Sequence, residues 1–287
     1  MLTMHRLPFR RHRSLQVGFT LIELAIVLVI LGLVLGGLVV PLATQVQSRK
    51  VNETEAIIGE IKESLYGYAI ANGRLPCPAT IAANGMENRR NDDAGIGPID
   101  AQTDGCRGGS YSGLLPWATL GVPEMDAWGN RFRYRVTNEF TRANGDATAI
   151  GFCVSPGPVV PGTDPNACTL ELMDAGDLIV ETRDPTTKTK RNLSTQVPAA
   201  VVSFGRNGHG ATNNQGIVLP DPPAANLDEN QNTNAASIRF LSRTATDEQA
   251  GCSDSAAGQP FCEFDDIVSW IPTSVLFNRL LAAGRLP

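Results

Sequence analysis

The feature that most constrains this chain of 287 residues is an apolar run near its N-terminus. Residues 24–43 read LAIVLVILGLVLGGLVVPLA and contain no charged side chain. A helix rises about 1.5 Å per residue, so about 20 residues reach across a hydrocarbon core of roughly 30 Å. The run therefore predicts a membrane-spanning helix over residues 19–43.

The segment before this run is basic. Residues 1–18 carry four arginines and no acidic side chain. Positive charge stays on the cytoplasmic side of a membrane, which places the rest of the chain outside the cytoplasm. A secretory signal peptide is the alternative, but its apolar region has about 7–15 residues and ends at a small-residue cleavage site. Here the apolar segment that begins at Phe19 is longer, contains Glu23, and offers a small-residue exit only near Ala43, just after Pro41.

Six cysteines follow the apolar run, and an even number on the oxidising side of a membrane favours disulfides. Loop closure favours partners that are close in the chain, so the expected pairs are Cys77–Cys106, Cys153–Cys168 and Cys252–Cys262. Zinc is the competing interpretation. It is disfavoured because no C-x-x-C occurs and His209 is the only histidine after the leader.

Charge and motifs exclude several classes of function. The net charge is −5, and it becomes −9 once the leader arginines are removed. An acidic exterior argues against general nucleic-acid binding. The sequence contains no G-x-S-x-G, Walker or H-E-x-x-H motif, so we expect no enzyme.

The pattern of apolar residues predicts an α+β fold. Residues 44–72 form an amphipathic continuation of the first helix, which Asn72-Gly73 and Pro76 should end. A second amphipathic helix is expected at 274–283. Helix first and strands later is typical of α+β domains. Strands are expected at 130–136, 149–154, 178–182, 200–204, 238–241 and 267–271.

One predicted strand alternates arginines with apolar residues. In NRFRYRV (130–136), Phe132 and Tyr134 should point to a core. The arginines in between, Arg131, Arg133 and Arg135, are expected to form a solvated row that pairs with acids. Binding of an anionic polymer is the alternative.

The residues Gly18-Phe19-Thr20-Leu21-Ile22-Glu23, after a basic leader, resemble the cleavage signal of type IV pilins and type II secretion pseudopilins. The resemblance implies that a prepilin peptidase removes residues 1–18 by cutting after Gly18 and methylates the new amine of Phe19. It also implies that Glu23 neutralises the Phe19 amine of a neighbouring subunit in a filament. An acid inside an apolar segment costs free energy unless it is paired, so the residues agree with this role.

Three later stretches, MDAWGNRFRYRV (125–136), VVSFGRNGHG (201–210) and DDIVSW (265–270), resemble the major pseudopilin of type II secretion. In that family the last two belong to a calcium loop, which implies Asp265, Asp266 and Asn207 as candidate ligands here. Asn207 stands where the family has an acid, and an insertion at about 211–264 interrupts the loop. We therefore expect the chain to bind no cofactor, and bound calcium is the alternative. We also expect a chelator to have little effect, because the Cys252–Cys262 disulfide closes the loop instead of an ion.

Together these features predict a pilin-like structural subunit of the bacterial inner membrane, with its N-terminus cytoplasmic and residues 73–287 forming a periplasmic sheet domain with large loop insertions. That domain is large, which favours a minor subunit. Its expected partners are the prepilin peptidase, other pilin or pseudopilin subunits and the inner-membrane assembly machinery. Two alternatives remain open: an adhesin-like or substrate-binding module delivered on a pilin helix, and a single-span protein that never polymerises.

Overall fold

The computed structural model describes residues 20–89, 106–141 and 176–284, without the side chains of 35–43 and 139. The chain divides into two compact units, Met1–Arg49 and Lys50–Pro287. The predicted strand at 149–154 lies outside the described residues.

Helix α1 runs from Leu21 to Asn72, so the predicted end of the helix is confirmed. Gly73 follows with φ +65°, a conformation that favours glycine, and its N–H donates to the Ala69 carbonyl at 2.9 Å. In the second unit the helix buries a stripe of side chains at helical spacing, namely Ile58, Ile61, Leu65 and Ala69. This stripe is the amphipathic pattern that the sequence predicts.

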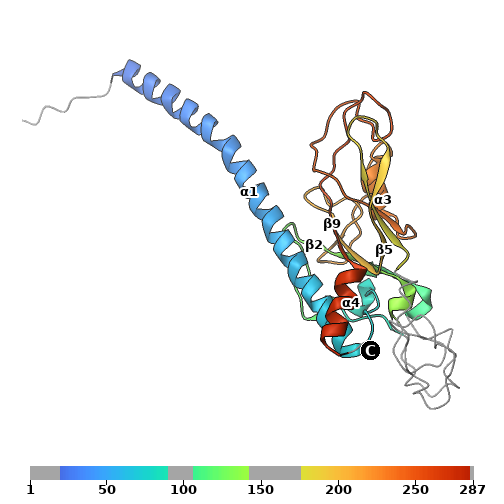
Figure 1. The fold of residues 1–287 in the computed structure, drawn as a ribbon. Coiled ribbons are helices and arrows are strands. Elements are labelled where there is room, and N and C mark those ends of the chain that lie inside the picture. The colour runs from blue at the N-terminus through green and yellow to red at the C-terminus, as the bar shows by residue number, and fades with distance from the viewer. Residues whose placement is uncertain (1–19, 90–105, 142–175, 285–287) are drawn as a thin grey trace, which may run out of the picture. The chain divides into compact units, whose positions relative to one another are not determined.

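The buried face of α1 in the second unit packs on a four-stranded antiparallel sheet. The strands are β1 (Ser112–Leu114), β3 (Arg133–Val136), β6 (Ala199–Ser203) and β9 (Ile267–Ile271), in the order β1-β3-β6-β9. Helix α4 (Thr273–Ala282) lies beside the last turns of α1 and adds Leu276, Phe277 and Leu280 to the same core (Figure 1). This arrangement confirms the α+β class.

A second core lies on the opposite face of this sheet. Strand β6 is buried throughout: Ala199 and Val201 belong to the first core, and Ala200 and Val202 to the second. A three-stranded sheet in the order β5-β4-β8 supplies the other wall, with β4 (Leu178–Arg183) antiparallel to β5 (Lys190–Val197) and parallel to β8 (Arg239–Leu241). We call this sheet, together with residues 211–264, the outer lobe.

Short elements connect these layers. They are the 3-10 turns η1 (Ile81–Ala83), η3 (Arg107–Gly109) and η4 (Asn138–Thr141), the helices α2 (Trp117–Leu120) and α3 (Leu227–Thr233), and the strands β2 (Asn130–Arg131) and β7 (Thr212–Asn213), which pair with each other.

The predicted strand at 130–136 is two strands, because its halves have different partners. Strand β2 pairs with β7 of the outer lobe, whereas β3 pairs with β1 and β6. The expectation of a solvated arginine row is wrong for Arg131 and Arg133, which are only 7% exposed. Arg131 does pair with an acid, Glu124, at 2.6 Å. Arg133 instead donates to backbone carbonyls of the outer lobe, which covers this face of the sheet.

Candidate functional site

The start of α1 brings Thr20 and Glu23 together. The Glu23 carboxylate accepts hydrogen bonds from the backbone N–H and the hydroxyl of Thr20, both at 2.9 Å. The N–H of Glu23 donates in return to Thr20 Oγ1 at 3.3 Å. This reciprocal arrangement is a capping box, which satisfies N–H groups that a helix start leaves without partners. Sequence reasoning missed this role, although the T-x-x-E spacing signals it.

The other residues of the predicted processing and assembly site, Gly18 and Phe19, lie outside the described residues. The pairing of Glu23 with a Phe19 amine therefore stays a prediction.

Two of the three predicted disulfides are present in the structure. Cys77 is bonded to Cys106, and Cys252 to Cys262, with Cα–Cα separations of 5.3 and 4.8 Å. The first ties the segment after α1 to the turn before β1, and the second closes a short loop of the outer lobe. Cys153 and Cys168 lie outside the described residues.

A cluster of three carboxylates lies where the outer lobe meets the strand β9. Asp265 and Asp266 precede β9, and Glu229 comes from the first turn of α3. One carboxylate oxygen from each residue lies within 4.8 Å of the others. Glu229 and Asp266 are buried, and Asp265 is half-buried. The fold thus brings both predicted aspartates together with a third acid that sequence reasoning missed.

Burial and mutual repulsion make these acids hard to ionise. Burial, together with a neighbouring carboxylate, raises the pKa of Glu229 to about 7 and that of Asp265 to about 6; the neighbour is Asp265 for Glu229 and Glu263 for Asp265. The pKa of Asp266 lies well above its usual range for the same two reasons. At neutral pH the cluster therefore needs either protons or a cation to offset its negative charge.

Asn207, the third predicted ligand, acts as a hydrogen-bond donor to the cluster. Its side-chain amide donates to Glu229 Oε1 at 2.9 Å and its backbone N–H donates to Asp265 Oδ2, also at 2.9 Å. Its side-chain oxygen accepts from the N–H of His209 at 3.0 Å. Asn207 therefore orients two acids and has its own oxygen engaged elsewhere.

Two further observations fit a hard cation at the cluster. The Oδ1 atom of Asp265 is shielded from solvent and has no hydrogen-bond partner among the described residues. Gly205 has φ +57°, and a Cβ there would lie 2.4 Å from this same atom, so only glycine leaves the space open. Carboxylate oxygens are the ligands that calcium prefers. Calcium takes six to eight oxygens, so water or backbone would have to complete the set.

The comparisons with known proteins recognise the N-terminus alone. Residues 14–39 match a family model described as "Prokaryotic N-terminal methylation motif". Neither the curated proteins nor the solved structures contain a match, and the resemblance of the later stretches to the major pseudopilin has no support from them. The methylation motif indicates a structural protein of the type IV pilin and pseudopilin class, processed by prepilin peptidase.

Such a signal also implies anchoring in the inner membrane by the N-terminal helix. The predicted span at 19–43 includes Phe19 and nine side chains, 35–43, that lie outside the described residues. In the part of the chain that the structure describes, no helix is both long and apolar enough to cross a membrane.

Proposed function

We propose that this chain is a minor subunit of a type IV pilus or a type II secretion pseudopilus, assembled with other pilins through α1. The observation that carries the proposal is the methylation motif at residues 14–39. The outer lobe supports a minor role, because it adds a second sheet and a second core to the helix-on-sheet layer. A subunit repeated along a whole filament has little need of such an addition.

The first test is the N-terminus of the mature chain. We expect mass spectrometry of membrane-derived protein to find N-methylated Phe19, with residues 1–18 absent. A retained leader would contradict assembly as a pilin and favour an anchored protein that never polymerises. A cut near Ala43 would indicate a secreted protein instead.

The second test separates the two roles of Glu23. The variant Glu23→Gln removes the charge but keeps a side chain that can complete a capping box, whereas Glu23→Ala removes both. If Glu23 neutralises the Phe19 amine of a neighbour, neither variant should enter filaments. The measurement is crosslinking to companion pilins in membranes, with equal abundance and equal leader cleavage confirmed. Normal assembly of Glu23→Gln would mean that the cap, and not the charge, is what assembly needs.

We also propose that Glu229, Asp265 and Asp266 hold a calcium ion, with Asn207 orienting two of them. The ion would supply the positive charge that three crowded carboxylates lack. It would join α3 to the segment before β9, and so fix the outer lobe to the central sheet. Little effect of a chelator was expected from the sequence because Asn207 replaces an acid and an insertion interrupts the loop. Glu229, which belongs to that insertion, supplies a third carboxylate beside Asp265 and Asp266.

A further inference from the structure

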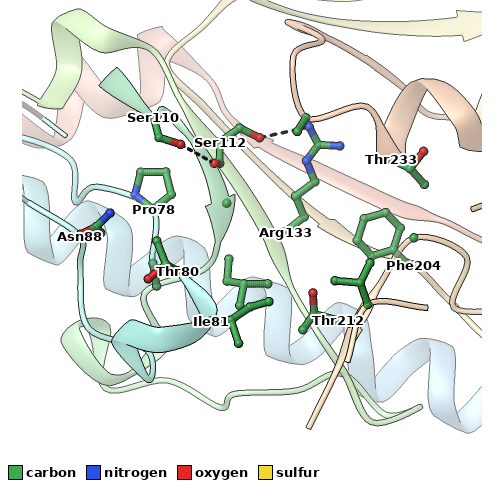
Figure 2. A pocket seen from close by; sticks show the side chains of 16 residues that line it. Pro78, Thr80, Ile81, Asn88, Ser110, Ser112, Arg133, Phe204, Thr212 and Thr233 are labelled. Carbon is green, nitrogen blue, oxygen red and sulfur yellow. Dashed lines mark hydrogen bonds between the residues drawn. The ribbon is translucent and has the colours of Figure 1, made fainter. Parts of the chain in front are cut away.

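A cavity of about 280 Å³ lies between the central sheet and the outer lobe, and none of the residues predicted for processing, disulfides or calcium lines it. One wall is formed by residues 78–81 and the edge strand β1, and the other by residues of the outer lobe such as Thr212, Val218 and Thr233. Figure 2 shows the side chains of Ile81, Thr212, Phe204 and Arg133 around it. Pockets of this kind, with apolar walls and a few convergent polar groups, are typical of small-molecule sites.

Among the residues that the structure describes, Arg133 is the only ionisable one that lines the cavity. Its guanidinium donates to the backbone carbonyls of Asn232 and Asn234 and, at 3.1 Å, to Ser112 Oγ. The guanidinium carbon lies 5.5 Å from the centre of the Phe240 ring. These acceptors are all neutral, and Arg133 forms no ion pair with any of the described residues.

The positive charge of this region is therefore only partly compensated. Burial and, to a smaller extent, the neighbouring Arg135 lower the pKa of Arg133 to about 10. Arg135 also lacks an ion pair among the described residues, and its Nε is buried without a hydrogen-bond partner. Asp266 is near enough to favour the charged form of Arg133, but it is itself hard to ionise. An anion in the cavity would thus gain from an arginine that the fold has already removed from water.

The rest of the lining suits a compact apolar group. Pro78, Ile81, Leu114, Phe204 and Val218 supply the apolar walls, and hydroxyl groups lie among them. Ile81 and Val218 are 47% and 59% exposed, so apolar surface continues to the mouth of the cavity. The carbonyl of Ser112 accepts from the Ser110 hydroxyl at 3.1 Å, so this part of the β1 edge is already engaged and offers less to an added peptide strand.

We propose that this cavity binds a small monocarboxylate with a short apolar chain, with the carboxylate directed toward Arg133 and the chain against Ile81, Leu114 and Val218. The size of the cavity limits the apolar part to a few carbon atoms. This site is distinct from the carboxylate cluster and does not depend on assembly into a filament.

The test uses the full chain in detergent and two matched probes, hexanoate and hexanamide, with binding measured by saturation-transfer NMR titration. We expect hexanoate to bind saturably and hexanamide to bind at least about tenfold more weakly, because hydrogen bonds to charged groups are stronger than those between neutral groups. Arg133→Gln should reduce hexanoate binding to the level of hexanamide. Equal affinity of the two probes for the unaltered chain would overturn the proposal.

Arg133 also donates hydrogen bonds to the outer lobe, so its replacement could disturb the fold. A second pair of variants therefore tests the cavity and leaves Arg133 unchanged. Val218→Trp should fill the cavity and weaken hexanoate binding at least about tenfold, as expected when a ligand's pocket is occupied. Ile217→Trp is the matched control, since Ile217 is 55% exposed and does not line the cavity. Equal binding by these two variants would place hexanoate elsewhere, for example in the detergent. A short peptide with a free C-terminal leucine is a further probe. If it binds more tightly than hexanoate, and if amidation of its C-terminus abolishes that binding, the ligand is a peptide terminus and the proposal of a small monocarboxylate is overturned.

Discussion

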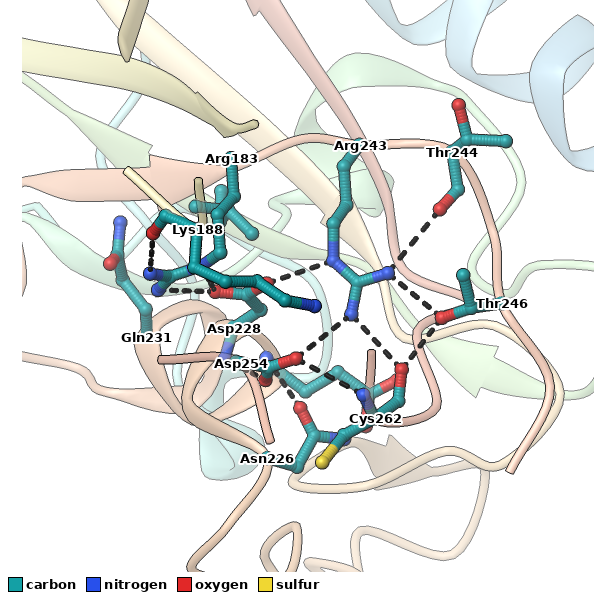
Figure 3. A network of polar contacts seen from close by, with 12 residues as sticks. Arg183, Lys188, Asn226, Asp228, Gln231, Arg243, Thr244, Thr246, Asp254 and Cys262 are labelled. Carbon is teal, nitrogen blue, oxygen red and sulfur yellow. Dashed lines mark hydrogen bonds and ion pairs between the residues drawn. The ribbon is translucent and has the colours of Figure 1, made fainter. Parts of the chain in front are cut away.

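Asp228 is the residue whose replacement should most clearly reveal how the outer lobe is held together. It is completely buried and pairs with Arg183 at 2.7 Å and with Arg243 at 2.8 Å. Arg243 also reaches Asp254 at 3.4 Å, and Figure 3 shows these side chains converging. The network joins β4, α3, the segment after β8 and the Cys252–Cys262 loop. Because Asp228 precedes Glu229, it also fixes the helix that carries this one member of the carboxylate cluster.

The substitution Asp228→Asn keeps the shape of the side chain and removes its charge. Arg183 then loses its carboxylate partner and keeps its bond to the Lys188 carbonyl. Arg243 keeps Asp254, which already accepts from the backbone N–H groups of Asp228 and Cys262. Breaking a buried pair in this way costs about 3–5 kcal/mol of unfolding free energy. In a unit of roughly 150–250 residues each kcal/mol lowers Tm by about 2–4 °C, so the expected drop is roughly 6–20 °C.

The assay is thermal unfolding of the full chain in detergent, followed by circular dichroism and by limited proteolysis of the outer lobe. Asp247→Asn is the matched control, because Asp247 pairs with Arg206 at 3.7 Å while 92% of its side chain is exposed. Exposed pairs of this kind contribute only about 0–1 kcal/mol. Equal melting of the two variants would refute the idea that the buried network holds the lobe.

Two further predictions concern the outer lobe and its attachments. Calcium at a hundredfold excess over its Kd should raise the unfolding free energy by about 2.7 kcal/mol. Glu229→Gln should abolish that response, and a chain whose melting ignores both calcium and chelator would refute the cation site. Replacing Cys77 and Cys106 by serine should cost more than replacing Cys252 and Cys262, about 4 against about 3 kcal/mol, because the bonds span 29 and 10 residues. Denaturant titration measures both, and the reverse order would contradict the loop-entropy argument.

Local patterns in the sequence predict most of the secondary structure. The amphipathic spacing and Asn72-Gly73 give the correct end of α1, and the strand predicted at 267–271 has the bounds of β9. These features depend on neighbouring residues, so a sequence can reveal them. Strand β5 was missed because its side chains, from Lys190 to Gln196, are mostly exposed and polar and lack the alternation that marks a half-buried strand.

Pairing across long separations explains the remaining differences. The arginines of β3 were predicted to form a solvated face, because no feature of their own segment indicates that the outer lobe covers them. Glu229 was missed for the same reason, since the fold alone brings it beside Asp265, where it accepts from the Asp265 N–H at 3.1 Å. Its helix could have been found, because Asn226 caps α3 and also donates to the Glu229 carboxylate. The start of α3 can be predicted from adjacent residues, whereas the contact of Glu229 with Asp265 depends on the tertiary fold.

The carboxylate of Glu23, the residue that first indicates a pilin, would gain a second candidate partner at the proposed cleavage. While the leader is attached, Phe19 has an amide and no ammonium, and the Glu23 carboxylate bonds to Thr20 within its own helix. Cleavage after Gly18 would create a positive amine one residue before Thr20, so that Glu23 would gain a second, charged candidate partner. A carboxylate at a helix start is favoured in both states, because the N-terminal end of the helix dipole is positive. In the uncleaved chain, the Glu23 carboxylate within the apolar segment is thus stabilised by the capping box. The predicted contact with the Phe19 amine of a neighbouring subunit requires cleavage, because only cleavage creates that amine.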